Sequence, residues 1–172
     1  LTQADFIACH NPAYVDQFDL LDGIVEGGSF LLNSPWSQEE MEQRLPAPLK
    51  RIIANKKLNF YNIDAVKIAT DLGLGGRINM IMQACFFQIA NVIPPEQAFG
   101  YMKDAIKKTY GSKGDKVVQM NYHAVDQSIA HLHRIELPAQ ADSELRKPPV
   151  VPAEAPEFVQ KTTARIIQSL GD

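Results

Sequence analysis

Three short apolar segments, each followed by a helical pattern, constrain the fold of this chain more than any other feature. The segments are Phe6 to Cys9, Ser29 to Asn33 and Leu58 to Ile63. Strand and helix alternate through this region, which is typical of a parallel sheet covered by helices. We therefore expect an α/β fold in which these three strands are parallel members of one sheet.

Capping signals predict where two of the intervening helices begin. Asn11 and Pro12 predict a helix from Ala13 to about Leu21, because Asn caps helices and Pro suits the first helical position. Ser37 and Glu40 stand three residues apart, the spacing of a capping box. Each of these helices would connect one strand to the next.

The C-terminal half is predicted to be helical. From Ile78 to Val92 nearly every residue is apolar, which indicates a buried helix, and Glu96 to Tyr110 forms another helix. After Asp115 apolar residues recur every three or four positions, which indicates a helix with one inward face. This stripe consists of Val118, Tyr122, Val125, Ile129 and Leu132.

Composition excludes several classes of function. Of the 172 residues 45% are hydrophobic and 22% are charged, and the net charge is −3. The chain thus offers no basic footprint for nucleic acid and no polybasic membrane anchor. No apolar run approaches the roughly 18 residues that span a bilayer. We expect a soluble, cytoplasmic protein that binds neither nucleic acid nor membrane.

A glycine-rich turn before the apolar helix is the best candidate for a binding site. Gly75 and Gly76 would let backbone N–H groups approach a ligand, and a helix N-terminus favours anions. Arg77 adds a cation suited to phosphate, and Asn79 adds a directional donor and acceptor. The alternative is a structural turn between two helices. The turn lacks the Walker lysine and the full dinucleotide-binding spacing.

Other reactive residues form no convincing catalytic or metal-binding set. Cys9 and His10 are adjacent at a strand end, and such neighbours point to opposite faces. His123, His131 and His133 are predicted on the solvated face of the last helix. Cys9 and Cys85 are too few for a disulfide framework. Gly27 and Gly28 are explained by a loop that needs a positive φ more readily than by a ligand. We expect no catalytic residue and no metal site.

The two ends suggest that the sequence is part of a longer polypeptide. An apolar segment follows Leu1 almost at once, without an initiator methionine. Residues 147–156 are rich in proline, which predicts an extended linker, and residues 157–172 would begin the following segment. Residues 1–146 would then form one domain.

Five segments together resemble the γ domain of pyruvate:ferredoxin (or flavodoxin) oxidoreductase, a member of the 2-oxoacid:ferredoxin oxidoreductase family. In chain order they are Ala4 to Ile24, Gly27 to Trp36, Asn59 to Ala65, Gly76 to Gln83 and Lys113 to Asn121. The resemblance implies a three-layer α/β/α, Rossmann-like, mostly parallel sheet. The family pattern begins with a further strand and glycine-rich loop, so the resemblance also implies a sheet that is incomplete at its N-terminal side.

The resemblance implies an enzyme that oxidatively decarboxylates pyruvate with coenzyme A to acetyl-CoA and CO2, with electrons passing to ferredoxin or flavodoxin. Thiamine diphosphate, Mg and [4Fe-4S] clusters would be held by other domains of a homodimeric enzyme. No cofactor is expected in this segment, which should be inactive alone.

Within that enzyme the segment would pack the subunit and help to form the coenzyme A site. Arg77 and Asn79 match the family's Arg-x-Asn at the helix start, and Gly75 and Gly76 would add backbone contacts. One alternative is a purely structural interdomain module without ligand contacts. Another is a free-standing nucleotide-binding protein.

Overall fold

A computed structural model describes residues 3–137, 151–152, 154–163 and 166. Half of the predicted proline-rich linker, residues 147–150 and 153, lies outside the described residues, as does the predicted domain boundary at residue 146. Helical structure begins again at residue 157 and includes η2 (Val159–Thr163), a short π-helical segment.

Four strands form one sheet in the order β1-β2-β3-β4. β1 (Ala4–Cys9), β2 (Ile24–Asn33) and β3 (Asn59–Ile63) run parallel, which confirms the predicted α/β architecture. β4 (His133–Ile135) pairs with β3 in the antiparallel direction. The sequence predicted helix at His133, and that prediction is wrong. α7 ends at Ala130, and burial of Ile135 against β3 favours a strand.

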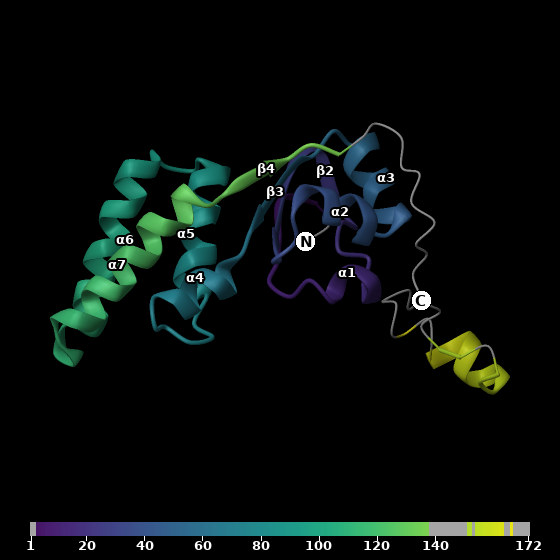
Figure 1. Cartoon of the computed structure of the whole chain (residues 1–172). Coiled ribbons are helices and arrows are strands. Elements are labelled where there is room, and N and C mark those ends of the chain that lie inside the picture. Colours follow the sequence, from purple (N-terminus) through teal and green to yellow (C-terminus); the bar gives the residue numbers. More distant parts are fainter. Residues whose placement is uncertain (1–2, 138–150, 153, 164–165, 167–172) are drawn as a thin grey trace.

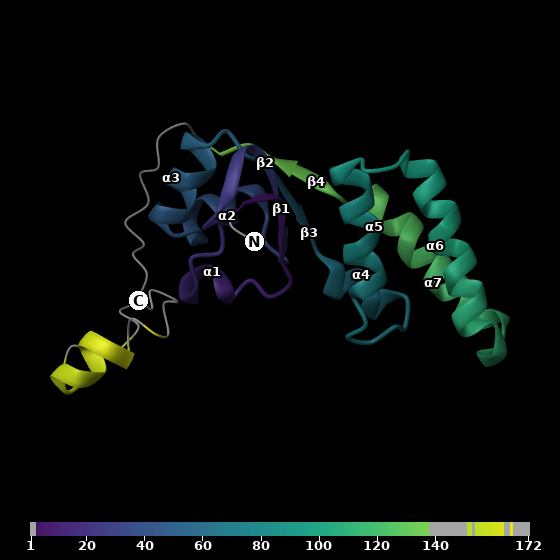
Figure 2. The same ribbon diagram turned by 180° about the vertical axis from the view of Figure 1, so that it is seen from behind.

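Three helices cover one side of the sheet, here called the first face (Figures 1 and 2). They are α1 (Tyr14–Gln17), α2 (Gln38–Arg44) and α3 (Ala47–Asn55). Ser37 and Glu40 form the predicted capping box at α2. The predicted helix up to Leu21 is wrong, because Phe18 already adopts an extended backbone.

The opposite side, the second face, is covered by α4 (Ala65–Asp71) and α5 (Asn79–Ala90). α6 (Pro95–Tyr110), η1 (Gly111–Lys113) and α7 (Asp115–Ala130) complete this helical half (Figure 1). Successive residues of β2 alternate between the two faces, as the strand pleat requires. Phe30 and Leu32 pack on the first face and Leu31 on the second, which produces three layers.

The predicted inward stripe of α7 is only partly correct. Val118 and Val125 are buried against α5 and α6, whereas Ile129 is exposed. Two polar side chains, Asn121 and Ser128, are buried instead, and each donates to the carbonyl one turn earlier. These local bonds explain their burial, since a buried polar group needs a partner.

Candidate functional site

The glycine-rich turn joins α4 to α5 on the second face. Gly73 and Gly75 have φ angles of 72° and 62°, a left-handed conformation that favours glycine. Between them the side chain of Leu74 is buried. The backbone N–H of Leu74 donates to the Ala69 carbonyl at 2.7 Å. The turn is therefore anchored to the core by one leucine while its glycines remain exposed.

Gly75 and Gly76 leave open space on the surface of the turn. A Cβ atom at either position would meet no heavy atom of the described residues within 4 Å. The φ of Gly75 demands glycine, whereas Gly76 is free of that requirement. The fold itself thus gives no reason for glycine at position 76, and the open space permits an external group to approach the backbone.

Arg77 is exposed beside these glycines and is fixed by a local hydrogen bond. Its Nε donates to the carbonyl oxygen of Leu74 at 2.9 Å. Among the described residues no carboxylate lies within ion-pair distance of the guanidinium. One edge of the guanidinium is occupied by the turn, and its terminal nitrogens can serve a ligand.

The first turn of α5 begins at Asn79, which is exposed. Its N-cap residue is Ile78, whose side chain cannot accept a hydrogen bond from the first N–H groups. The helix start therefore presents backbone donors and a partial positive charge next to Arg77. The structure brings all four predicted residues, Gly75, Gly76, Arg77 and Asn79, into this one segment.

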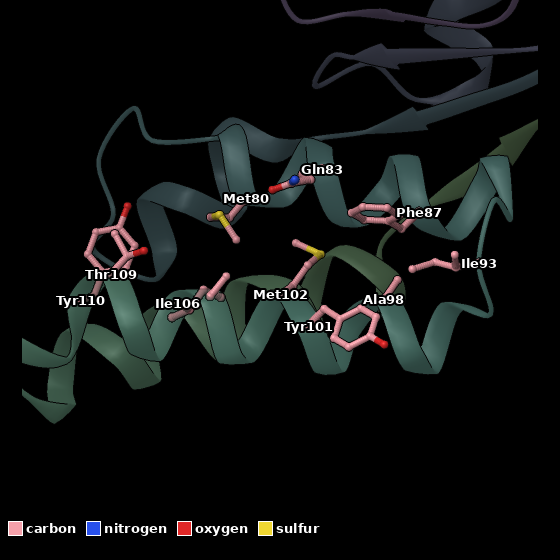
Figure 3. Close-up of a pocket in the computed structure, with 11 residues that line it drawn as sticks. Met80, Gln83, Phe87, Ile93, Ala98, Tyr101, Met102, Ile106, Thr109 and Tyr110 are labelled. Carbon is pink, nitrogen blue, oxygen red and sulfur yellow. The ribbon is translucent and has the colours of Figure 1, made fainter.

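An apolar pocket that sequence patterns do not reveal lies between α5 and α6. Figure 3 shows Met80 and Phe87 of α5 facing Met102 of α6 across this pocket. The volume of the pocket is about 390 Å³. Periodicity alone assigns Met80 to the core, but its side chain is only half-buried and lines this pocket. α5 is thus buried through Ile81 and exposed at Asn79 and Gln83, so the prediction of a wholly buried helix is partly wrong.

The cysteines and histidines do not form a reactive cluster. Cys9 is buried and its Sγ lies 3.0 Å from the Asn11 carbonyl, whereas His10 is exposed. Burial raises the pKa of the Cys9 thiol, and burial raises the pKa of Cys85 to about 12. Both thiols are therefore held in the unreactive protonated form. Across the described part of the chain, no three His, Cys, Asp or Glu side chains gather as metal ligands.

No helix in the described ranges is long and apolar enough to cross a membrane.

Comparison with solved structures identifies the same fold in oxidoreductases. A pyruvate oxidoreductase subunit, PORC, from Thermotoga maritima superposes with a TM-score of 0.60 at 16% identity, covering 79% of this chain and 67% of that one. A 2-oxoglutarate:ferredoxin oxidoreductase from Magnetococcus marinus, solved with 2-oxoglutarate, coenzyme A and succinyl-CoA, gives a TM-score of 0.52 at 20% identity, covering 73% of this chain and 19% of that one.

Comparison with curated proteins gives much higher identities. Pyruvate:ferredoxin oxidoreductase of Moorella thermoacetica is 56% identical over 172 residues, all of this chain and 15% of that protein. Pyruvate-flavodoxin oxidoreductase of Klebsiella pneumoniae is 44% identical over 170 residues, 99% of this chain and 14% of that protein. The chain thus corresponds to a small part of each relative. The family model for pyruvate ferredoxin/flavodoxin oxidoreductase matches residues 1–131, and the chain belongs to this family.

Proposed function

We propose that this chain is part of an enzyme that oxidatively decarboxylates pyruvate with coenzyme A, yielding acetyl-CoA and CO2 and reducing ferredoxin or flavodoxin. Within that enzyme the chain packs against other domains and contributes to the coenzyme A site. The relatives named above support the reaction. The observation that carries the binding role is the open glycine turn that leads into the uncapped start of α5 beside Arg77.

The residues of the turn suit the phosphate groups of coenzyme A. Backbone N–H groups near Gly76 and at the start of α5 can donate to phosphate oxygens. Arg77 can pair with a phosphate through its terminal nitrogens, because its Nε is already held by Leu74. Asn79 can donate to or accept from a neighbouring polar group.

The iron–sulfur clusters of the proposed reaction do not fit the described residues. Thiamine diphosphate would form the carbanion and [4Fe-4S] clusters would carry electrons, and Mg would accompany the diphosphate. An iron–sulfur cluster needs cysteine thiolates, yet the two cysteines here are separately buried thiols. Other domains of the same enzyme would hold these groups. Those domains would also form the docking surface for ferredoxin or flavodoxin.

The alternative function is a structural interdomain module. The hydrogen bond from Arg77 to Leu74 favours it, since that bond alone can explain the arginine as a brace of the turn. The two functions differ in whether changes in the turn alter coenzyme A binding, and this can be measured.

We expect Arg77→Ala in the intact enzyme to raise the apparent KM for coenzyme A by one to two orders of magnitude, about 1.5–3 kcal/mol for a lost charged hydrogen bond. The KM for pyruvate should stay nearly unchanged. Arg77→Lys should restore only part of the loss, because an ammonium cannot form the guanidinium fork. Steady-state kinetics with each substrate varied in turn measure both constants.

Two further variants separate binding from folding. Gly76→Ala adds a methyl group that meets none of the described residues within 4 Å, so it should weaken coenzyme A binding without lowering thermal stability. Arg51→Ala removes an exposed arginine of α3, on the first face, and should change neither KM. Normal coenzyme A kinetics in both Arg77→Ala and Gly76→Ala would favour the structural module.

A further inference from the structure

The side of α5 that faces away from the sheet keeps apolar surface open to solvent. α5 contains no charged residue and most of its residues are apolar, a composition typical of a helix that is buried on all sides. In the structure residues 86–90 are only half-buried, and the fully buried positions are Ile81, Met82, Ala84 and Cys85. The described residues therefore cover only part of a helix whose composition requires more cover.

Three aromatic rings extend this open surface from the sheet to the pocket between α5 and α6. Phe6 lies on β1, the edge strand, and its ring centroid is 5.1 Å from that of Phe86. The ring centroids of Phe86 and Phe87 are 5.3 Å apart, and Phe87 lines the pocket (Figure 3). All three side chains are half-buried. These rings, here called the aromatic strip, form one continuous apolar surface with the pocket.

The pocket has the composition of the centre of a protein–protein interface. Such centres are rich in aromatic residues and methionine, and they are poor in charged residues. None of the eleven residues that line the pocket is charged. The lining includes two methionines, Met80 and Met102, and three aromatic residues, Phe87, Tyr101 and Tyr110. This composition favours an apolar partner.

The charged residues of α6 lie outside the lining of the pocket. They are Glu96, Lys103, Asp104, Lys107 and Lys108. A second cavity, the crevice at the carboxyl ends of β2 and β3, differs in this respect, because its lining includes Glu40, Asp64, Lys67 and Asp71. Burying a charge without a partner is costly. Apolar side chains can therefore fill the pocket between α5 and α6 without burying a charge of its lining.

We propose that the aromatic strip and the pocket bind an amphipathic helix from another part of the same polypeptide. This proposal rests on the proposed function, in which the chain is part of a larger enzyme. The chain spans only 15% and 14% of the two relatives described above, so most of each relative lies outside the matched region and can supply such a helix. A helix suits the pocket because apolar residues spaced three and four apart can pack between two neighbouring helices.

Two other occupants match this surface less well. A second copy in a symmetric dimer would place the pocket opposite the same pocket, and two hollows cannot fill each other. A small molecule in the pocket would leave the rings of Phe6 and Phe86 uncovered, because neither residue lines the pocket. A helix of the same polypeptide can fill the pocket and cover the aromatic strip together.

The test uses the intact enzyme with the photoreactive amino acid p-benzoylphenylalanine in place of Tyr101. Tyr101 lines the pocket and is 59% exposed, so another aromatic side chain there should leave α6 folded. Irradiation should link position 101 to a peptide of the same polypeptide that lies outside these 172 residues, and mass spectrometry identifies that peptide. Absence of such a link, or a link between two polypeptides in its place, would overturn the proposal.

Ala105→Arg, combined with the photoreactive residue, tests whether the pocket itself makes the contact. Ala105 lines the pocket and is exposed, and Arg is a good helix former, so α6 should remain folded. The yield of the cross-link should fall about tenfold, because a guanidinium without a partner would enter an apolar contact. Gln119→Arg adds the same side chain at an exposed position of α7 outside the lining and should leave the yield unchanged. Equal yields in the two variants would refute the site.

These measurements are independent of the proposed coenzyme A site. The cross-link requires neither coenzyme A nor turnover, and the KM values of Arg77→Ala do not report on this contact. The mass of the natural polypeptide shows separately whether the chain is part of a larger enzyme. The docking surface and the coenzyme A site can therefore fail one without the other.

Discussion

Single buried asparagines hold the carboxyl ends of the strands in place. Asn33 donates from Nδ2 to the His10 carbonyl at 2.9 Å and accepts from the Ala65 N–H at 2.9 Å. One side chain thus ties the end of β1 to the end of β2 and to the start of α4. Asn62, near the end of β3, ties that strand to the loop after β2, because its Nδ2 donates to the Ser34 carbonyl at 3.1 Å. Such positions look like ordinary polar residues in the sequence, because their partners are distant along the chain.

Asn33→Ala should lower the free energy of unfolding by about 1–3 kcal/mol, because it leaves the buried Ala65 N–H without a partner and removes the bond to the His10 carbonyl. Asn55→Ala, at an exposed position of α3, should change it by less than about 0.5 kcal/mol. Urea denaturation of both variants measures the difference. Equal midpoints would contradict a stabilising role for the Asn33 hydrogen bonds.

Stability should fall as the pH rises above 9, in part through Cys85. Its pKa is about 12 in the folded protein because of burial, above the ordinary value of 9.0. The folded state therefore keeps a proton that the unfolded chain releases between these pH values, so unfolding becomes easier as pH rises. Urea denaturation at pH 7, 9 and 10.5 tests this. The decline should be smaller in Cys85→Ala, and an identical decline would exclude Cys85 as its source.

At the scale of elements, an irregular start of β2 determines how it pairs with β1. Ala4 is opposite Ile24, but Phe6 is opposite Ser29, so β2 contains additional residues there. Gly27 has a φ of 72°, and the backbone of Gly28 lies close to Asp5. The sequence prediction of a loop at these glycines is wrong, because β2 runs through both of them, and only the positive φ of Gly27 agrees with it.

Gly28→Ala should destabilise the chain by about 1–3 kcal/mol, since overpacking forces neighbouring atoms apart. The added Cβ would lie 3.0 Å from the Val25 carbonyl oxygen and 3.2 Å from that of Asp5. Gly111→Ala is the matched control, because its φ of −56° suits any residue and its Cβ would meet nothing within 4 Å. Thermal unfolding compares them, and equal melting temperatures would show that the β1–β2 contact can relax.

At the scale of the whole molecule, the described residues form a sheet that is covered by helices on both faces. The sheet carries α1–α3 on its first face and the larger helical half on its second face (Figure 2). The glycine turn, the apolar pocket and the crevice between β2 and β3 are all formed around α4 and α5. An ancillary role in a larger enzyme is consistent with this arrangement.

The chain by itself should neither release CO2 from pyruvate nor reduce a viologen dye, even with thiamine diphosphate and Mg supplied. The reason is that its described residues offer neither cluster ligands nor a reactive thiol. Radiometric CO2 release and dye absorbance measure the two activities, with the intact enzyme as positive control. Turnover by the pure chain would contradict the proposed division of labour.

Sequence patterns alone determined the three parallel strands, the capping box at Ser37 and the location of the glycine turn, because these depend on neighbouring residues. Tertiary structure decided the rest. β4 forms because residues after α7 meet the free edge of β3, where Arg134 donates to Asn59, 75 positions away. The crevice lined by Trp36 and Asp64 exists only because consecutive connections leave the sheet on opposite faces. Local propensity contains no information about contacts between residues that are distant in the sequence, so these features depend on tertiary packing.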